Sequence, residues 1–331
     1  MIIETKGLAK TYRHYEKEAG LKGSFKALFQ RKYTNKTALA NFDLSVEEGE
    51  FVGLIGPNGA GKTTLVKMLT GIIAPTSGSV SVMGYYPNKL ENAFKQQYAV
   101  VMGQKSQLFF ELTAADTFLL FKELYGISDE QYKKNLDYFV ELFQVSQYLN
   151  VQVRTLSLGE RMKMELIVAL LHNPRVLFLD EPTIGLDAVA QKQVRGFLKE
   201  VNDQKGTTIL LTSHYMEDIK SLCRRSVVVN HGVKIYDGDT DTLFERYQGQ
   251  KKVTASFEQQ APAKLPEGCA PLEQRENKLS FLISRERSQE ILRELMTCGG
   301  LTDITIEEEE IGSVVERIYQ DTMWEGKREQ K

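Results

Sequence analysis

The stretch from Gly56 to Thr64, GPNGAGKTT, constrains the fold of this chain more than any other feature. It follows the apolar run Phe51 to Ile55, which is typical of a strand buried on both faces of a parallel sheet. The pattern G-x4-G-K-T matches a P-loop, whose backbone N–H groups wrap phosphates while the next helix points its positive N-terminus at them. We therefore expect an α/β fold in which a strand, this turn and a helix bind a nucleoside triphosphate.

The residue types in the loop indicate their separate roles. Glycine is needed because a Cβ would block the close approach of the backbone to phosphate. Lys62 would reach the β and γ phosphates, and the Thr63 hydroxyl would ligate Mg²⁺. The residues expected at the nucleotide are Gly56, Pro57, Asn58, Gly59, Ala60, Gly61, Lys62, Thr63 and Thr64.

Two further apolar runs end in polar residues that suit hydrolysis. Val176 to Leu179 is followed by Asp180, which would hold the magnesium shell, and Glu181, which would polarise the attacking water as general base. An acidic pair after a strand can also be a helix cap, but the P-loop favours catalysis. The run TTILLTS ends at His214, which at the same sheet edge would contact the γ-phosphate and align the water.

The segment TLSLGERMKMEL predicts a helix that begins at Ser157. Ser157 and Glu160 have the S-x-x-E spacing of a capping box, and apolar residues recur at helical spacing after it.

The order of these motifs resembles the ATPase subunits of ABC transporters over roughly residues 1 to 240. The resemblance implies a P-loop NTPase fold of ABC type, with a mixed sheet core and an inserted helical subdomain at about 105–165. It implies ATP and Mg²⁺ as cofactors. It also identifies Tyr12 with the aromatic residue that stacks on adenine, Gln104 with a glutamine that reaches the magnesium, Glu181 with the catalytic glutamate and His214 with the switch histidine.

In the same family, the signature segment contacts the γ-phosphate bound to the opposite subunit. The resemblance assigns this contact to Ser157 and Gly159, and assigns Asp187 to the loop that crosses the dimer. Leu158 and Glu160 depart from the usual glycine and glutamine. We expect the Glu160 carboxylate to weaken closure unless it folds back onto the helix cap. The variant SLGER resembles ATPases that serve type-two exporters.

The chain has one P-loop and one signature, so two chains must together enclose two ATP molecules. The second subunit is an identical copy or a related chain. We expect the motion to drive separate integral membrane permease subunits, for export of a cargo. They would dock near the helical subdomain, and Leu108 to Phe110 is either a docking surface or ordinary core packing.

Two regions lie outside the motifs. Residues 13–36 form a basic insertion, either a solvated loop or an amphipathic helix that lies on anionic lipid. Residues 246–331 predict a small α+β domain, separate from the ATPase domain at 1–245. Its predicted elements are strands near 251–258, 277–284 and 301–310 and helices near 288–297 and 311–320, and a dimerising or regulatory role would follow from the resemblance.

Composition limits the rival classes. Lys plus Arg, 42, nearly balance Asp plus Glu, 44, so no overall basic field favours nucleic acid. Neither a signal-peptide core nor a run of about 20 apolar residues is present. We expect a cytoplasmic protein held at the inner face of the membrane by its permease. The alternative is a soluble ABC ATPase with a non-transport partner, but the long heptad segments or paired cassettes of such proteins are missing.

Overall fold

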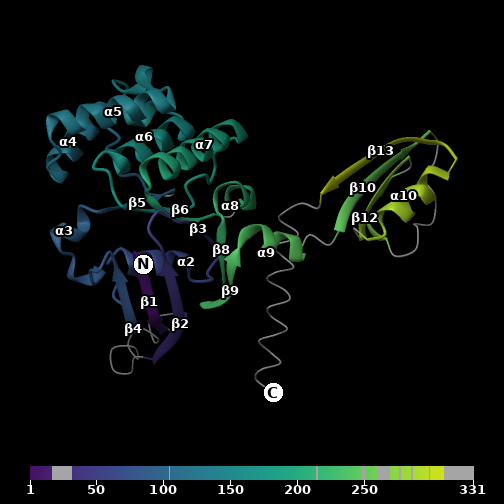
Figure 1. Ribbon diagram of the computed structural model, residues 1–331, viewed down its shortest axis with the longest axis horizontal. Coiled ribbons are helices and arrows are strands. Elements are labelled where there is room, and N and C mark those ends of the chain that lie inside the picture. The colour runs from purple at the N-terminus through teal and green to yellow at the C-terminus, as the bar shows by residue number, and fades with distance from the viewer. Residues whose placement is uncertain are drawn as a thin grey trace, which may run out of the picture. The chain divides into compact units, whose positions relative to one another are not determined.

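The apolar strand before the P-loop lies inside a six-stranded sheet (Figure 1). All five residues of β3, Phe51–Ile55, are buried. The sheet order is β5-β6-β7-β3-β8-β9, and every neighbouring pair is parallel except β8 and β9. The other strands are β5 (Tyr98–Met102), β6 (Val176–Asp180), β7 (Thr208–Thr212), β8 (Arg225–Asn230) and β9 (Val233–Asp239). This is the mixed sheet that the sequence predicts.

The computed structural model describes residues 1–16, 32–103, 105–213, 215–247, 250–258, 269–275, 277–284, 286–297 and 299–308. Gln104, His214 and the middle of the basic insertion lie outside these ranges. So does the helix predicted near 311–320.

A three-stranded antiparallel sheet packs on the six-stranded one with α2, Lys62–Leu69, in the core between them. Its order is β2 (Lys32–Val46), β1 (Ile3–Glu16) and β4 (Ser77–Val82). The apolar side chains of both sheets and of α2 form one buried cluster. Side chains of both sheets therefore pack against α2 and hold the P-loop at its N-terminus in place.

The ends of the basic insertion differ from the sequence prediction. Residues 13–16 and 32–36 are neither loop nor helix, because they continue β1 and β2 as an antiparallel ladder that pairs Arg13 with Asn35 and Glu16 with Lys32. A strand pair can extend beyond the core with polar side chains, since its backbone hydrogen bonds are satisfied internally. The helix or loop expected for the rest of the insertion lies outside the described residues.

A layer of helices covers the other side of the six-stranded sheet (Figure 1). The signature helix α6 packs on β5 and on three neighbouring helices. The helices of this layer are α4 (Ala114–Tyr125), α5 (Asp129–Phe143), α6 (Leu158–Leu170), α7 (Ala188–Lys205) and α8 (Met216–Leu222). The short helix α3 (Asn92–Lys95) packs on the opposite side, where its Phe94 joins the buried cluster around α2. Short 3-10 turns occur at Pro87–Lys89, Ser146–Tyr148 and Val153–Thr155.

The chain divides into two compact units, Met1–Asp239 and Thr240–Lys331. The division falls a few residues before the position expected from the sequence, because α9, Thr240–Tyr247, groups with the second unit.

The second unit has an antiparallel sheet of order β11-β12-β10-β13, and the apolar face of α10 packs on it. The elements are β10 (Gln250–Phe257), β11 (Ala270–Arg275), β12 (Lys278–Ser284), α10 (Ser288–Thr297) and β13 (Leu301–Glu308). The α+β prediction and four of its elements are confirmed, whereas β11 was not predicted. Pro271 and the polar residues around it hide the usual strand pattern of this edge strand.

Candidate functional site

The P-loop connects β3 to α2 by a backbone path that only glycine allows at two positions. Gly61 is the N-cap of α2 with φ of 111°, and no side chain caps this helix. A Cβ at Gly61 would lie 2.5 Å from the Ala38 carbonyl oxygen, and one at Gly56 would lie 2.3 Å from the Val229 carbonyl oxygen. The loop therefore presents the N-terminus of α2 to the pocket without a competing side-chain acceptor.

Lys62 is folded back onto its own loop. Its side chain is buried, and its Nζ donates to the carbonyl oxygens of Gly56 at 2.6 Å and Pro57 at 3.2 Å. Burial lowers the pKa of Lys62, while the negative charges of Glu181 and Asp180 raise it. An ammonium group held this way is positioned before any anion arrives.

Asp180, at the end of β6, lies next to the first turn of α2. Its carboxylate accepts from the Thr63 hydroxyl at 3.0 and 3.2 Å and from the Thr212 hydroxyl, on β7, at 2.6 Å. Three neighbouring elements thus bring hydroxyl and carboxylate oxygens together at the carboxyl edge of the sheet.

Glu181 follows Asp180 in the left-handed region, with φ of 57°. Its N–H donates to the Thr212 carbonyl oxygen at 3.0 Å, which ties this turn to β7. The backbone of Gly103 comes so close that a Cβ there would lie 2.1 Å from the Glu181 carbonyl oxygen. A left-handed glutamate carries backbone strain, and these backbone contacts hold the turn from which the Glu181 side chain reaches the pocket.

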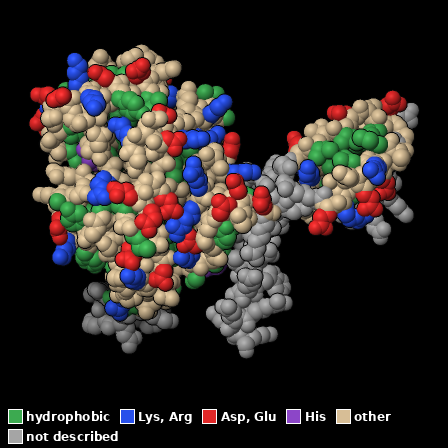
Figure 2. Space-filling view, in the orientation of Figure 1, with side chains coloured by type: hydrophobic (Ala, Val, Ile, Leu, Met, Phe, Trp, Pro, Cys, Tyr) green, Lys and Arg blue, Asp and Glu red, His purple; other side chains and the backbone are tan. Residues whose placement is uncertain are grey.

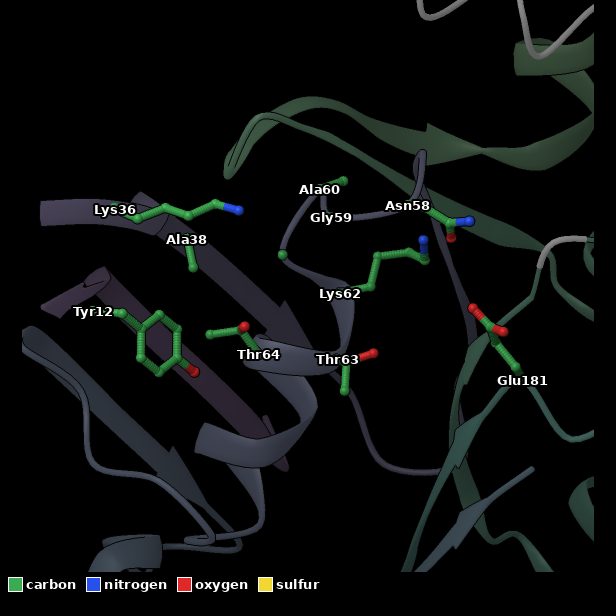
Figure 3. A pocket seen from close by; sticks show the side chains of 11 residues that line it. Tyr12, Lys36, Ala38, Asn58, Gly59, Ala60, Lys62, Thr63, Thr64 and Glu181 are labelled. Atoms are coloured by element: carbon green, nitrogen blue, oxygen red, sulfur yellow. The ribbon is translucent and has the colours of Figure 1, made fainter. Parts of the chain in front are cut away.

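Lys62, Thr63 and Glu181 line a pocket of about 360 Å³ (Figure 3), whereas Asp180 is not among the lining residues and reaches the site through its contact with Thr63. Tyr12 and Lys36 reach it from β1 and β2, Lys62 and Thr63 from the P-loop, and Glu181 from the end of β6. Its lining also includes Asn58, Gly59, Ala60, Gly61 and Thr64, as expected, together with Ala38. Gly56 and Pro57 do not line the pocket, but their carbonyl oxygens accept hydrogen bonds from Lys62 Nζ. Lys36 was not predicted as a site residue, although its place as the β2 neighbour of Tyr12 links the two.

The signature residues lie at a second pocket of about 470 Å³. Ser157, Gly159 and Asp187 all line it, and among the described residues no lining residue belongs to both pockets. The two halves of the predicted site are therefore separate pockets within one chain.

The capping box at the start of α6 is confirmed. The Ser157 hydroxyl accepts from the Glu160 N–H at 3.3 Å, and the Glu160 carboxylate accepts from the Ser157 N–H at 2.8 Å. This backbone hydrogen bond is the main reason that the pKa of Glu160 lies below its usual value. Glu160 thus folds back onto the helix cap, the arrangement that the sequence left open.

Leu158 and Gly159 fit against the neighbouring loop and helix. A Cβ at Gly185 would lie 3.1 Å from Leu158 Cδ2, and a Cβ at Gly159 would lie 3.0 Å from the Cβ of Ala190. Asp187 caps α7 by accepting from the Ala190 N–H at 2.8 Å. The leucine that replaces the usual glycine therefore packs beside the loop that ends at Asp187.

Gln104 and His214 are predicted site residues outside the described ranges, and only their neighbours can be placed. Ser213 donates to the buried carboxylate of Asp218 at 2.8 Å and accepts from the Tyr215 N–H at 3.0 Å. Asp218 also accepts from Thr183, in the loop after Glu181. Sequence reasoning did not find Asp218, because its contacts join segments 35 residues apart.

Comparison with known proteins agrees with this geometry. Residues 39–184 match the family model described as ABC transporter. The chain is 33% identical over 217 residues to the ABC transporter ATP-binding protein NatA of Bacillus subtilis (strain 168), covering 66% of this chain and 88% of that protein. It is 34% identical over 247 residues to the Nod factor export ATP-binding protein I of Burkholderia thailandensis, covering 74% and 80%.

Solved structures share the fold. An ATP-binding subunit of an ABC transporter superposes with a TM-score of 0.61 at 26% identity, covering 75% of this chain and 93% of that one. The post-hydrolysis dimer of the ATP-binding cassette MJ0796, bound to ADP and Pi, gives a TM-score of 0.59 at 24% identity, covering 72% and 98%. With its P-loop, carboxylates and signature helix so arranged, the chain belongs to the ABC transporter family as an ATP-binding ATPase subunit.

Proposed function

We propose that this chain is a Mg²⁺-dependent ATPase that powers a separate membrane permease for export by closing with a second subunit around ATP. The observation that carries the proposal is the pair of pockets, one with the phosphate-binding and catalytic side chains and one with the signature residues.

The first pocket suits a triphosphate with its metal. The oxygens of Thr63 and Asp180 are within hydrogen-bonding distance of each other, and such hydroxyl and carboxylate oxygens are what Mg²⁺ prefers. These two residues would hold the metal, with Gln104 as a further ligand. When bound, Mg²⁺ neutralises charge on the β and γ phosphates.

The protein side chains divide the remaining work. Lys62 would exchange the carbonyl oxygens of Gly56 and Pro57 for phosphate oxygens, and Tyr12 would stack on adenine. Glu181, fixed at the pocket by its turn, would accept the proton of the attacking water, and His214 would align that water.

Dimer closure explains why the signature is remote from the P-loop. Ser157, Gly159 and Asp187 would contact the γ-phosphate and the P-loop side of the partner subunit, so ATP would join two chains until hydrolysis removes the bridge. The partner is an identical copy or a related chain.

The permease would dock on the helical layer. In the run from Leu108 to Phe110, Leu108 is buried, whereas Phe109 and Phe110 remain 48% and 46% exposed. Exposed leucines of α4 (Leu119, Leu120 and Leu124) add apolar surface in the same subdomain. Where exposed apolar residues form a contiguous patch, they are typical of an interaction surface. No helix among the described residues is long and apolar enough to cross a membrane.

Export is supported by the type-two signature and by similarity to a Nod factor export protein. The basic insertion at 13–36, which resembles that of polysaccharide-exporting members of the family, also keeps a lipid-linked polymer among the cargoes. The subunit would lie at the inner face of the membrane. Acidic and basic side chains are interspersed on the face shown in Figure 2, which does not favour nucleic acid binding at that face. An anionic lipid surface for residues 13–36 and a dimerising or regulatory role for the second unit stay predictions.

The first test is to tag the chain in its native cells, extract with mild detergent and identify what co-purifies. We expect an integral membrane protein that is released only by detergent. Co-purification with ribosomes or nucleic acid, or with nothing, would overturn the transport role and favour a soluble ABC ATPase.

Hydrolysis is tested separately with Glu181→Gln. Turnover should fall at least about a hundredfold, because a general base typically contributes that much, while ATP-dependent dimers persist. Unchanged turnover would contradict the role of Glu181.

A further inference from the structure

Glu165 is a buried carboxylate in the middle of the signature helix that none of the roles above uses. It lies two turns after Ser157 on α6, and its side chain is only 4% exposed. Buried carboxylates are expensive unless hydrogen bonds or charges compensate them. Its partners therefore indicate what it is for.

Within the described residues, the hydrogen bonds of the Glu165 carboxylate all go to one short segment, residues 106–108. One carboxylate oxygen accepts from the Ser106 hydroxyl, and the two oxygens each accept from the Gln107 N–H at 3.0 Å. The Leu108 N–H lies 3.4 Å from the same oxygen that Ser106 contacts. Burial raises the pKa of Glu165, whereas the bonds from Ser106, Gln107 and Leu108 lower it. Glu165 thus holds two consecutive backbone amides and a hydroxyl in one carboxylate clamp.

Residues 106–108 lie between a predicted residue of the nucleotide site and the proposed docking surface for the permease. It follows Gln104, and it precedes the exposed Phe109 and Phe110 directly. The segment is also tied to β5 of the sheet, since the Gln107 side-chain amide donates to the Val100 carbonyl oxygen at 2.8 Å. The Phe110 ring, in turn, lies 5.5 Å from the guanidinium of Arg161 on α6.

We infer that Glu165 is a positioning residue that makes the exposed phenylalanines and the signature helix move together, so that the docking state of a permease is transmitted to Ser157 and Gly159. This inference rests on the proposed function, in which the permease docks at Phe109 and Phe110. Without the hydrogen bonds to Glu165, residues 106–108 could shift along α6. A movement of Phe109 and Phe110 would then no longer displace the signature residues at the start of α6.

The test is Glu165→Gln in the complex that co-purifies from native cells and in the isolated chain. Glutamine has nearly the same shape, but its NH₂ group opposes the backbone N–H donors and its charge is gone. The quantity to measure is the stimulation ratio, which is kcat of the complex divided by kcat of the isolated chain, together with KM for ATP. Ser106→Ala is the matched control. It removes a hydroxyl that donates to Glu165 and accepts from the Leu108 N–H at 3.1 Å, but it leaves both backbone N–H groups and the carboxylate in place.

We expect Glu165→Gln to lower the stimulation ratio by about threefold or more, within the range of measured coupling effects. Its KM and the kcat of the isolated chain should stay within about twofold of the wild type, since Glu165 lines neither pocket. Ser106→Ala should keep most of the stimulation. An equal loss of kcat in the isolated chain would show a merely structural role and overturn the inference, as would an unchanged ratio.

Amide hydrogen exchange of the wild-type chain tests the clamp without any variant. The N–H groups of Gln107 and Leu108 should exchange slowly, and rapid exchange at both would overturn the inference. If the wild-type ATPase is not stimulated by any membrane partner, the proposed function fails. If the wild type is stimulated and Glu165→Gln is stimulated equally, only the role of Glu165 fails.

Discussion

The two pockets of the first unit differ in what holds their functional groups. The nucleotide pocket is built at strand ends, where Lys62 is fixed by the carbonyl oxygen of Gly56 and Asp180 by the hydroxyl of Thr212. The signature pocket is built at helix starts, where Ser157 and Asp187 each cap their own helix. Backbone turns at strand ends restrict residue identity, because an added Cβ collides with neighbouring backbone. At a capped helix start the cap is the main constraint, and here Leu158 stands directly after it in place of the usual glycine.

The largest effect on binding is expected from Lys62→Ala. Loss of a charged donor to phosphate should weaken ATP binding about ten- to a hundredfold, since a hydrogen bond to a charged group contributes about 1.5–3 kcal/mol. The measurement is the Kd of a fluorescent ATP analogue. Lys36→Ala is the control in the same pocket, and its exposed side chain should contribute less than about threefold. Equal losses for both lysines would mean that the pocket senses only net charge.

A smaller effect, confined to closure, is expected at Ser157. In the Glu181→Gln background, Ser157→Ala should weaken ATP-dependent dimers about tenfold, because it removes both the hydroxyl and the cap. Ser157→Asn separates the two causes, since asparagine is an equally good cap but lacks the hydroxyl. Size-exclusion chromatography at several chain concentrations gives the dimer constants. If Ser157→Asn dimerises like the wild type, the cap and not the hydroxyl matters.

The sequence predicted the residues of the nucleotide pocket better than the buried carboxylates that connect distant segments around it. The P-loop, Asp180, Glu181 and the capping box at Ser157 follow from short patterns, because strand, turn and helix are adjacent in sequence. Glu165 and Asp218 could not be found this way, since their partners lie 59 and 35 residues away and no local pattern marks them. The strand ladder of residues 13–16 with 32–36 was missed because the basic composition of the insertion 13–36 as a whole resembles a solvated loop.

His172 offers a test of the joint between the helical layer and the sheet. Its ring stacks on Tyr125 of α4 at 3.9 Å, and its Nε2 lies 3.1 Å from the Tyr98 carbonyl oxygen on β5. Nε2 must donate to that carbonyl, which places the proton of the neutral ring there. Burial lowers the pKa of His172 to about 4.

Acid should therefore weaken this joint. Below an unfolded pKa of about 6.5 the unfolded chain binds a proton at this residue that the folded chain does not bind until about pH 4. The free energy of unfolding should fall across this window, by about 3 kcal/mol at most. His172→Phe keeps the stacking and cannot titrate, so its urea midpoint should fall less between pH 7 and pH 5. His231→Asn, at an exposed turn, is the control and should retain the wild-type slope.

The smallest effect is expected at Glu160. It tests whether the signature pocket works equally well with glutamate and with the usual glutamine at this position. Its carboxylate is engaged with the Ser157 N–H, so Glu160→Gln should change the dimer constant by less than about threefold and cost a few tenths of a kcal/mol of stability. Because the folded pKa is lowered, the cap is complete above the usual carboxyl pKa and is lost as the pH falls through the folded value. Glu160→Ala, without any acceptor, should cost about 0.5–1 kcal/mol in thermal unfolding. Dimers that became tenfold tighter in Glu160→Gln would show the opposite, namely that the carboxylate faces the partner's triphosphate and opposes closure.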